Sequence, residues 1–386
     1  MILTEKAKDA LKNLYFRTCR CIRGKKKRVL FSSFNGSSYS DNPRAVSEAM
    51  HALYPEVQLL WLFNAPADKD GIVPDYVTCV DNGNPFAACR ALAVADAVVE
   101  NFSLPKVPKG RQLFVQTWHG DKAFKKILYD SPFAAEDEEV AESVDGYCDL
   151  AVAGSAYGER QYRTAFRYRG LVLNEGTPRN DRLVRRDASE IAAVRHTLGV
   201  GDDCRIFLYA PTLRRQNCRD KSEQNISALD VAATLDLLEA RDGCRWIALM
   251  RAHPSGVGLC GVREDARIRN VSDYEDMADL LLVADLLVTD YSSCAGDFAL
   301  TGRELVLFQA DFEVYQKQDR TLYFRMEDSP YYVARSQAEL CEILLGMTPD
   351  AAAENCRAIL EFYGDTESGH AAERVAKYIG ERLYQK

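Results

Sequence analysis

The sequence lacks any apolar run that approaches the roughly 20 residues of a membrane-spanning helix. It also does not open with a secretory signal peptide, because no small-residue cleavage site follows an apolar segment. The 12 cysteines are scattered, and the one close pair, Cys19 and Cys21, lacks the spacing of metal ligands. Carboxylates and histidines form no cluster with that spacing either. We therefore expect a cytoplasmic protein with reduced, mostly buried thiols, no catalytic metal and no cofactor.

The length of 386 residues exceeds what one hydrophobic core usually serves, so two domains are expected. From Arg28 onward, strand-like and helix-like segments alternate, which is typical of a parallel α/β fold. A first series of strands is predicted at residues 28–34, 57–63, 76–80, 97–101, 112–118 and 150–154. A second series is predicted at residues 205–210, 244–250, 268–271, 285–290 and 305–308.

These two series predict two Rossmann-like α/β domains that face each other across a cleft. We place the first domain at residues 28–185 and the second at residues 186–386. The last predicted helix, at about residues 370–383, is expected to pack near the junction. Residues 1–27 form a separate leader.

The leader has a charge opposite to that of the rest of the chain. Residues 1–28 contain ten basic and two acidic residues, although the whole chain carries a net charge of −8. Apolar residues recur there at helical spacing, which predicts an amphipathic helix with a basic face. Such a helix is suited to the surface of an anionic membrane, and the alternative is a helix that packs on the first domain. The acidic remainder disfavours a nucleic-acid partner, because phosphate backbones would repel it.

A hydroxyl-rich turn follows the predicted strand at residues 285–290. The strand delivers Thr289, Asp290, Ser292 and Ser293 to the start of the next predicted helix. Backbone N–H groups and hydroxyls at a helix start attract phosphate, and open α/β sheets bind ligands at this edge. The turn is therefore a candidate phosphate site, unless a serine merely caps the helix.

Other polar residues follow predicted strands in the same way. His119 ends one strand and is followed by Lys122 and Lys126, which places a potential acid or base beside cations. In the second half, Thr212 and Arg214 follow one strand, and Arg251 and His253 follow the next. One arginine guanidinium can bind two phosphate oxygens at once, and a neighbouring histidine can donate a hydrogen bond to a leaving-group oxygen. Surface charges at loop ends are the alternative for each motif taken singly.

The ordered motifs FNGSSYSDNPRA, QTWHGDKAFKK, GTPRND, YAPTLRR, RAHP and VTDYSS resemble those of the CDP-glycerol glycerophosphotransferase family of teichoic-acid-type polymer enzymes. The resemblance spans nearly the whole chain after the leader. It implies a GT-B fold in which the second domain holds the CDP group and the first holds the acceptor. It also implies peripheral attachment to the cytoplasmic face of the cell membrane, through residues 1–28.

Within this resemblance, the acceptor hydroxyl attacks the β-phosphorus of CDP-glycerol or a related CDP-alditol and expels CMP. His119 corresponds to the family's WHG histidine and is the expected general base. The expected donor-binding residues are His253, Arg251, Thr212, Arg214, Thr289, Asp290, Ser292 and Ser293, with His253 also acting in catalysis. Lys122 and Lys126 are expected to contact the acceptor, which the family's chemistry makes a lipid-linked one.

Two alternatives stay open from the sequence. The same fold serves glycosyltransferases and epimerases that use UDP-sugars, and the nucleotide that binds would separate these from a CDP-dependent enzyme. A non-catalytic scaffold on the membrane surface is the second alternative. It would retain its biological activity after substitution of both His119 and His253.

Overall fold

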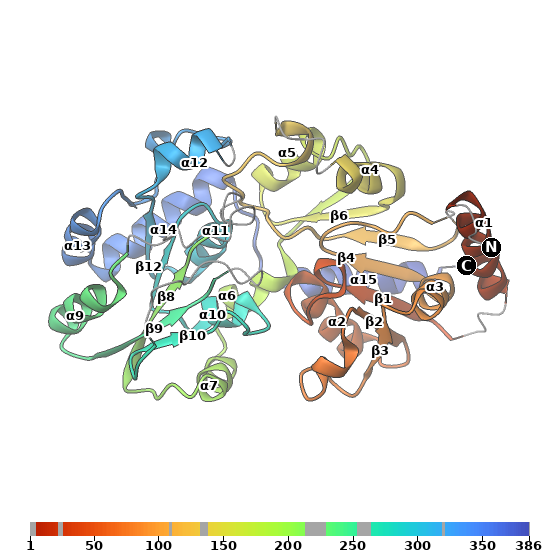
Figure 1. The fold of residues 1–386 in the computed structure, drawn as a ribbon, viewed down its shortest axis with the longest axis horizontal. Coiled ribbons are helices and arrows are strands. Elements are labelled where there is room, and N and C mark those ends of the chain that lie inside the picture. Colours follow the sequence, from red (N-terminus) through yellow and green to blue (C-terminus); the bar gives the residue numbers. More distant parts are fainter. Residues whose placement is uncertain are drawn as a thin grey trace. The chain divides into compact units, whose positions relative to one another are not determined.

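The computed structural model describes residues 5–21, 26–107, 110–131, 138–212, 229–252, 264–318 and 321–385. The chain divides into two compact units (Figure 1). The first unit comprises Met1–His119, Phe133–Asp181 and Thr366–Lys386, and the second comprises Gly120–Pro132 and Arg182–Asp365. No helix in the described ranges is long and apolar enough to cross a bilayer.

The first unit contains a seven-stranded parallel sheet with the order β3-β2-β1-β4-β5-β6-β7. Its central strands β4, β5 and β6 are buried at every position, which explains why they read as continuous apolar runs. The strands are β1 (Arg28–Ser32), β2 (Gln58–Phe63), β3 (Val77–Asp81), β4 (Ala97–Glu100), β5 (Leu113–Gln116), β6 (Leu150–Ala153) and β7 (Leu171–Asn174). The helices are α1 (Glu5–Cys21), α2 (Asp41–Leu53), α3 (Pro85–Val94), α4 (Glu138–Tyr147), α5 (Ala156–Thr164) and α15 (Ala371–Tyr384). Short 3-10 turns lie at Phe34–Gly36, Pro66–Lys69 and Pro178–Asn180.

The second unit contains a six-stranded parallel sheet with the order β10-β9-β8-β11-β12-β13. The strands are β8 (Cys204–Ala210), β9 (Arg245–Met250), β10 (Ile268–Asn270), β11 (Leu286–Thr289), β12 (Glu304–Phe308) and β13 (Val333–Ala334). The helices are α6 (Asp181–Arg185), α7 (Ala188–Thr197), α9 (Val231–Asp242), α10 (Met277–Val283), α11 (Cys294–Phe298), α12 (Phe312–Gln318), α13 (Gln337–Gly346) and α14 (Pro349–Tyr363). Short 3-10 turns lie at Leu128–Asp130, Ala299–Thr301 and Met326–Asp328.

Both sheets grow outward in two directions from their first strand, the strand order of a Rossmann fold. This order confirms the predicted parallel α/β architecture of each half. In the first unit, β1 and β4 pair as far as Ser32 and Glu100, so the loops after these strands start side by side. In the second unit, β11 and β8 pair through Thr289 and Ala210, with the same result. Each adjacent pair of carboxyl ends forms a switch point, where open α/β sheets bind ligands.

The last helix belongs to the first unit, although we expected the second domain to extend to residue 386. Helix α15 presents Val375, Ile379 and Leu383, spaced by four residues, to the core beneath the first sheet. It packs beside α2 (Figure 1). Both oxygens of the Asp181 carboxylate accept hydrogen bonds from its first turn, at 2.8 Å each from the amides of Ala371 and Ala372. Packing and capping together hold this helix to the first unit.

The leader contributes helix α1, which packs against α3 in the first unit (Figure 1). Phe16 and Cys19 are buried, and the Tyr15 ring meets the Phe86 ring edge-on, with centroids 5.3 Å apart. Leu14 nevertheless remains 63% exposed. One face of α1 therefore packs on the first domain, as the alternative interpretation of the leader expects. Another face is exposed to solvent.

Candidate functional site

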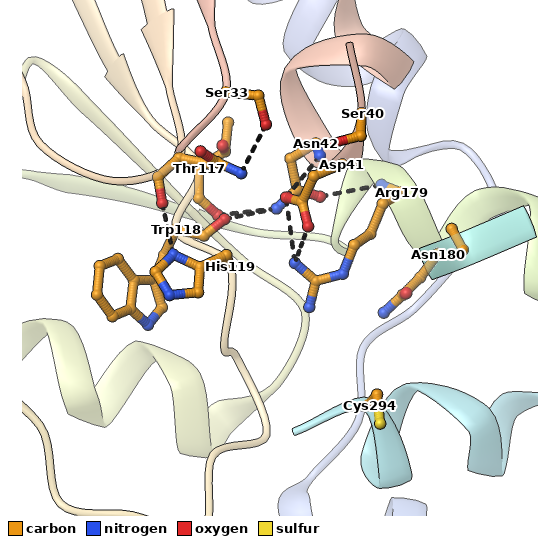
Figure 2. Close-up of polar contacts among 12 residues, drawn as sticks. Ser33, Ser40, Asp41, Asn42, Thr117, Trp118, His119, Arg179, Asn180 and Cys294 are labelled. Carbon is orange, nitrogen blue, oxygen red and sulfur yellow. Dashed lines mark hydrogen bonds and ion pairs between the residues drawn. The ribbon is translucent and has the colours of Figure 1, made fainter. Parts of the chain in front are cut away.

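In the first unit, His119 follows β5 at the carboxyl edge of the sheet (Figure 2). Its Nδ1 atom lies 2.8 Å from the carbonyl oxygen of Asn101, which follows the neighbouring strand β4. Because a carbonyl oxygen only accepts hydrogen bonds, this contact assigns the proton to Nδ1 and the lone pair of the neutral ring to Nε2. The geometry therefore prepares Nε2 to take up a proton.

The carbonyl that orients His119 is itself held firmly in place. Asn101 is fully buried, and its side chain accepts from the amide of Phe34 at 2.7 Å and donates to the Ser33 hydroxyl at 3.2 Å. Phe34 and Ser33 follow β1, so Asn101 connects the two loops of the switch point. This connection fixes the hydrogen-bond acceptor for His119 before any substrate binds.

The Glu100 side chain also stabilises the loop that follows β4. Its Oε1 atom accepts from the amides of Asn101 and Phe102, at 3.0 and 3.2 Å. Burial raises the pKa of this carboxyl to about 8, and hydrogen bonds from Ser32 and the neighbouring amides oppose the rise. At neutral pH the carboxyl is therefore largely protonated.

Three aromatic rings surround the His119 imidazole. The centroids of Trp118, Phe34 and Phe102 lie 4.1, 5.3 and 5.7 Å from that of His119. Phe102 is stacked on the imidazole, with an interplanar angle of 20°. The rings restrict the imidazole to one orientation and reduce its contact with water.

In the second unit, a threonine and an aspartate join the two loops of the switch point. Thr212 follows β8, and its amide donates to Asp290 Oδ1 and Oδ2 at 2.9 and 3.0 Å. The Thr212 hydroxyl also donates to Asp290 Oδ1. Asp290 is only 2% exposed, and its hydrogen bonds order the turn. We had expected Asp290 among the donor-binding residues, and this structure gives it a positioning role.

Thr289 also holds the turn in place. Its side chain is completely buried, and its hydroxyl donates to the Ala210 carbonyl oxygen at 2.6 Å. This hydrogen bond ties β11 to β8 and leaves no surface for a ligand. The expected donor contact of Thr289 is thus replaced by a structural role.

The two serines have a different environment. Ser292 and Ser293 are half-buried and lead into α11, a helix of only five residues. The Cys294 amide approaches the Ser292 hydroxyl at 3.4 Å, whereas Ser293, the N-cap residue, makes no hydrogen bond to the helix with its side chain. The predicted strand, turn and helix are confirmed, and capping does not account for the Ser293 hydroxyl.

Arg251 follows β9 and, with Ala252, is one of the two described residues of the RAHP motif. Its Nη1 atom donates to the carbonyl oxygen of Tyr274 at 2.7 Å, and burial lowers the pKa of its guanidinium. The guanidinium is thus fixed against the segment that contains the sequence VSDY. His253 and Arg214 lie outside the described residues, so their predicted roles stay predictions.

The segment after His119 belongs to the second unit, contrary to the expected boundary. Phe124 and Lys126 make backbone hydrogen bonds with the segment at residues 321–323. Lys122 is completely buried, and its ammonium group lies 3.0 Å from Asp365 Oδ1 and 3.7 Å from Asp121 Oδ2. This ion-paired burial contradicts the expected contact of Lys122 with the acceptor. Lys126 is half-buried, and its predicted acceptor contact stays a prediction.

Comparison with known proteins identifies the family. A sequence profile described as CDP-glycerol:poly(glycerophosphate) glycerophosphotransferase matches residues 14–381. The chain belongs to this family. This membership confirms the resemblance inferred from the motifs.

Two curated relatives illustrate the range of lengths in this glycerophosphotransferase family. The chain is 29% identical to the teichoic acid poly(glycerol phosphate) polymerase of Bacillus subtilis (strain 168), over 92% of this chain and 49% of that protein. It is also 29% identical to the teichoic acid glycerol-phosphate transferase of Staphylococcus aureus (strain NCTC 8325 / PS 47), over 92% of this chain and 93% of that protein. The chain thus spans about half the length of the first relative.

Solved structures give the same result for the fold. A variant of the wall teichoic acid polymerase TagF soaked with CDPG matches with a TM-score of 0.81 and 26% identity, over 98% of this chain and 94% of that chain. A UDP-GlcNAc 2-epimerase from Methanocaldococcus jannaschii matches with a TM-score of 0.51 and 10% identity, over 92% of this chain and 99% of that chain, and shows a likeness of fold alone. The fold is therefore GT-B-like, as expected.

Sequence reasoning did not identify Glu100, Asn101 or Ser33 as part of the site. A usable signal exists for the first two, because they end the apolar segment AVVEN, where polar residues reach the carboxyl edge of the sheet. Ser33 gives no comparable signal, since serine is common after any strand. Its contact with Asn101 depends on the pairing of β1 with β4, which residue spacing does not reveal.

The raised pKa of Glu100 predicts a specific pH dependence of stability. The folded protein holds this proton up to about pH 8, whereas an unperturbed carboxyl releases it near pH 4.5. The free energy of unfolding should therefore fall as the pH rises through this window, by at most about 1.4 kcal/mol per pH unit. Glu100→Gln should lack this decline in urea unfolding between about pH 5 and 8. Glu381→Gln, at an exposed position of α15, is the control, and a Glu100→Gln profile parallel to that of the parent would contradict the assignment.

Proposed function

We propose that this chain transfers glycerol phosphate, or a related alditol phosphate, from the CDP-activated donor to a hydroxyl of a lipid-linked polyol-phosphate or glycan acceptor. The reaction would serve the synthesis of a teichoic-acid-like polymer and would release CMP. One observation carries the proposal: a member of this family holds its WHG histidine by Nδ1, with the lone pair on Nε2.

The proposed mechanism is an in-line displacement at phosphorus. Nε2 of His119 takes the proton of the acceptor hydroxyl, whose oxygen attacks the β-phosphorus of CDP-glycerol. The bond from this phosphorus to the bridging oxygen breaks, and CMP leaves with the electron pair. The product is a phosphodiester. Catalysis of this kind depends mainly on positioning and on stabilising charge.

The donor diphosphate is assigned to the second unit. Ser292 and Ser293 supply hydroxyls at the switch point, and Arg251 supplies a fixed guanidinium. Thr212 and Asp290 hold the two loops together beneath them. His253 and Arg214 complete the proposed donor set, and His253 would stabilise the departing phosphate of CMP.

The general-base role of His119 is tested by substitution. His119→Ala should lower the rate of acceptor-dependent CMP release from CDP-glycerol by about 100-fold or more, because a general base typically contributes that much. Binding of CDP-glycerol, measured by calorimetry, should stay within about 2-fold, since the donor is assigned to the other unit. His196→Ala, at an exposed position of α7, is the control. Normal turnover by His119→Ala would refute the assignment.

We also propose that the first unit docks on an anionic membrane through α1 and α3. Leu14 and Phe86 are 63% and 61% exposed. Each has an exposed arginine on the same side of its helix, Arg17 three residues after Leu14 and Arg90 four residues after Phe86. Large apolar side chains beside cations are suited to the interface of an anionic bilayer.

The double variant Leu14→Glu/Arg17→Glu tests this docking surface. It removes an apolar contact and reverses a charge, so partition onto phosphatidylglycerol vesicles in a flotation assay should weaken by about 10-fold or more. Leu345→Glu changes a leucine that is 62% exposed on α13 of the second unit, and it should bind like the parent. Unchanged binding by the double variant would place the membrane contact elsewhere.

A further inference from the structure

The backbone immediately before His119 is strained. Trp118 has a φ of 49°, in the left-handed region that bulky side chains rarely occupy. Such a conformation is unfavourable by itself and persists only where the surrounding structure enforces it. The groups that enforce it therefore also determine where His119 lies.

Two side chains hold this turn: Gln116 Oε1 accepts from the Trp118 amide at 2.8 Å, and Asn42 binds the backbone from helix α2 (Figure 2). The Nδ2 atom of Asn42 donates to the carbonyl oxygens of Thr117 and Trp118, at 3.2 and 2.7 Å. These are the two carbonyls that directly precede His119. Asn42 is completely buried in the first turn of α2, so water does not compete for either hydrogen bond.

The third segment in this arrangement is the turn at Pro178–Asn180. Asn42 Oδ1 accepts from the amide of Arg179 at 3.0 Å, which fixes the orientation of the asparagine amide group. The Arg179 guanidinium donates to both oxygens of Asp41, at 3.3 and 3.2 Å, next to Asn42 in the sequence. Glu367 holds the same turn through the amide of Thr177, at 2.7 Å.

We propose that Asn42 is a positioning residue for His119, and that Arg179 and Asp41 keep Asn42 in place. The inference rests on the proposed function and deepens it. It gives a role to two motifs that the mechanism had left unused, because Asp41 and Asn42 belong to FNGSSYSDNPRA and Arg179 belongs to GTPRND. Asparagine suits this position because one amide both donates twice and accepts once.

The variant Asn42→Asp tests the inference with little change of volume. It keeps an oxygen for the Arg179 amide but replaces the two-fold donor by an acceptor that faces two carbonyls. We expect kcat for CMP release to fall by about 10- to 100-fold, as misplacement of a reacting group does. The KM for CDP-glycerol should stay within about 2-fold. Asn42→Ala, which removes the donor without adding charge, should show the same split.

Gln112 provides a matched control within the same unit. It is also buried, and its Nε2 atom donates to two backbone carbonyls, those of Leu92 and Ala95, at 2.5 and 2.9 Å. It lies before β5, at the opposite end of that strand from His119. Gln112→Glu and Gln112→Ala should lower the melting temperature as the Asn42 variants do, yet leave kcat within about 2-fold. An equal loss of kcat in the Asn42 and Gln112 variants would contradict the positioning role and show that Asn42 acts only on stability.

A double-mutant cycle separates positioning from general destabilisation. In the His119→Ala background, Asn42→Asp should cause no further loss of kcat, because residues that act as a unit are not additive. A further 10-fold loss in that background would overturn the inference.

A readout independent of turnover completes the test. The 15N signals of the His119 ring, assigned through His119→Ala among the five histidines, report which nitrogen carries the proton. They should show an Nδ1–H tautomer in the parent and a mixture of tautomers in Asn42→Asp. A parent without CMP release would refute the proposed function, whereas an unchanged tautomer in Asn42→Asp would refute the positioning role.

Discussion

The reversal of strand order beside β1 and beside β8 is the constraint on which the rest of this structure depends. In a parallel sheet all carboxyl ends lie at one edge, and at the reversal two neighbouring loops turn away to opposite sides. Side chains must then join those loops. Asn101 does so in the first unit through Ser33, and Asp290 does so in the second through Thr212. The other polar groups at the carboxyl edge of each sheet are thereby held in fixed positions.

Electrostatics at the two edges differ in a way that suits phosphoryl transfer. In the first unit, burial keeps Glu100 largely protonated at neutral pH, and the Asn101 carbonyl oxygen assigns the proton of His119 to Nδ1. In the second unit, the Asp290 carboxylate accepts hydrogen bonds from Thr212, and Ser292, Ser293 and Arg251 are the proposed hydrogen-bond donors for a ligand. Asp276 and Glu275 also act electrostatically on the Arg251 guanidinium, whose fork of N–H groups is suited to a diphosphate.

The spacing of apolar residues and the turn residues between segments predicted most of the fold, because buried parallel strands appear in the sequence as short apolar runs. The strands β7 and β13 were missed, since β7 is at most half-buried and β13 has two residues. The position of α15 and the burial of Lys122 were also missed, because both depend on packing partners far away in the sequence. In the candidate site, motif positions predicted His119 and the serines, whose roles stay proposals. The hydrogen bonds of Asn42 to the Trp118 carbonyl and of His119 to the Asn101 carbonyl were missed, because they join segments far apart in the sequence.

In the proposed reaction, a CDP-activated alditol phosphate is the donor, and CMP leaves as an acceptor hydroxyl attacks. The most direct measurement is nucleotide release from CDP-glycerol, CDP-ribitol and UDP-N-acetylglucosamine in parallel, with a lipid-linked acceptor analogue and with product length followed. We expect CMP release that requires the acceptor and matches the incorporated alditol phosphate mole for mole. Release of UDP from the UDP-sugar, with neither CDP-alditol turned over, would contradict it.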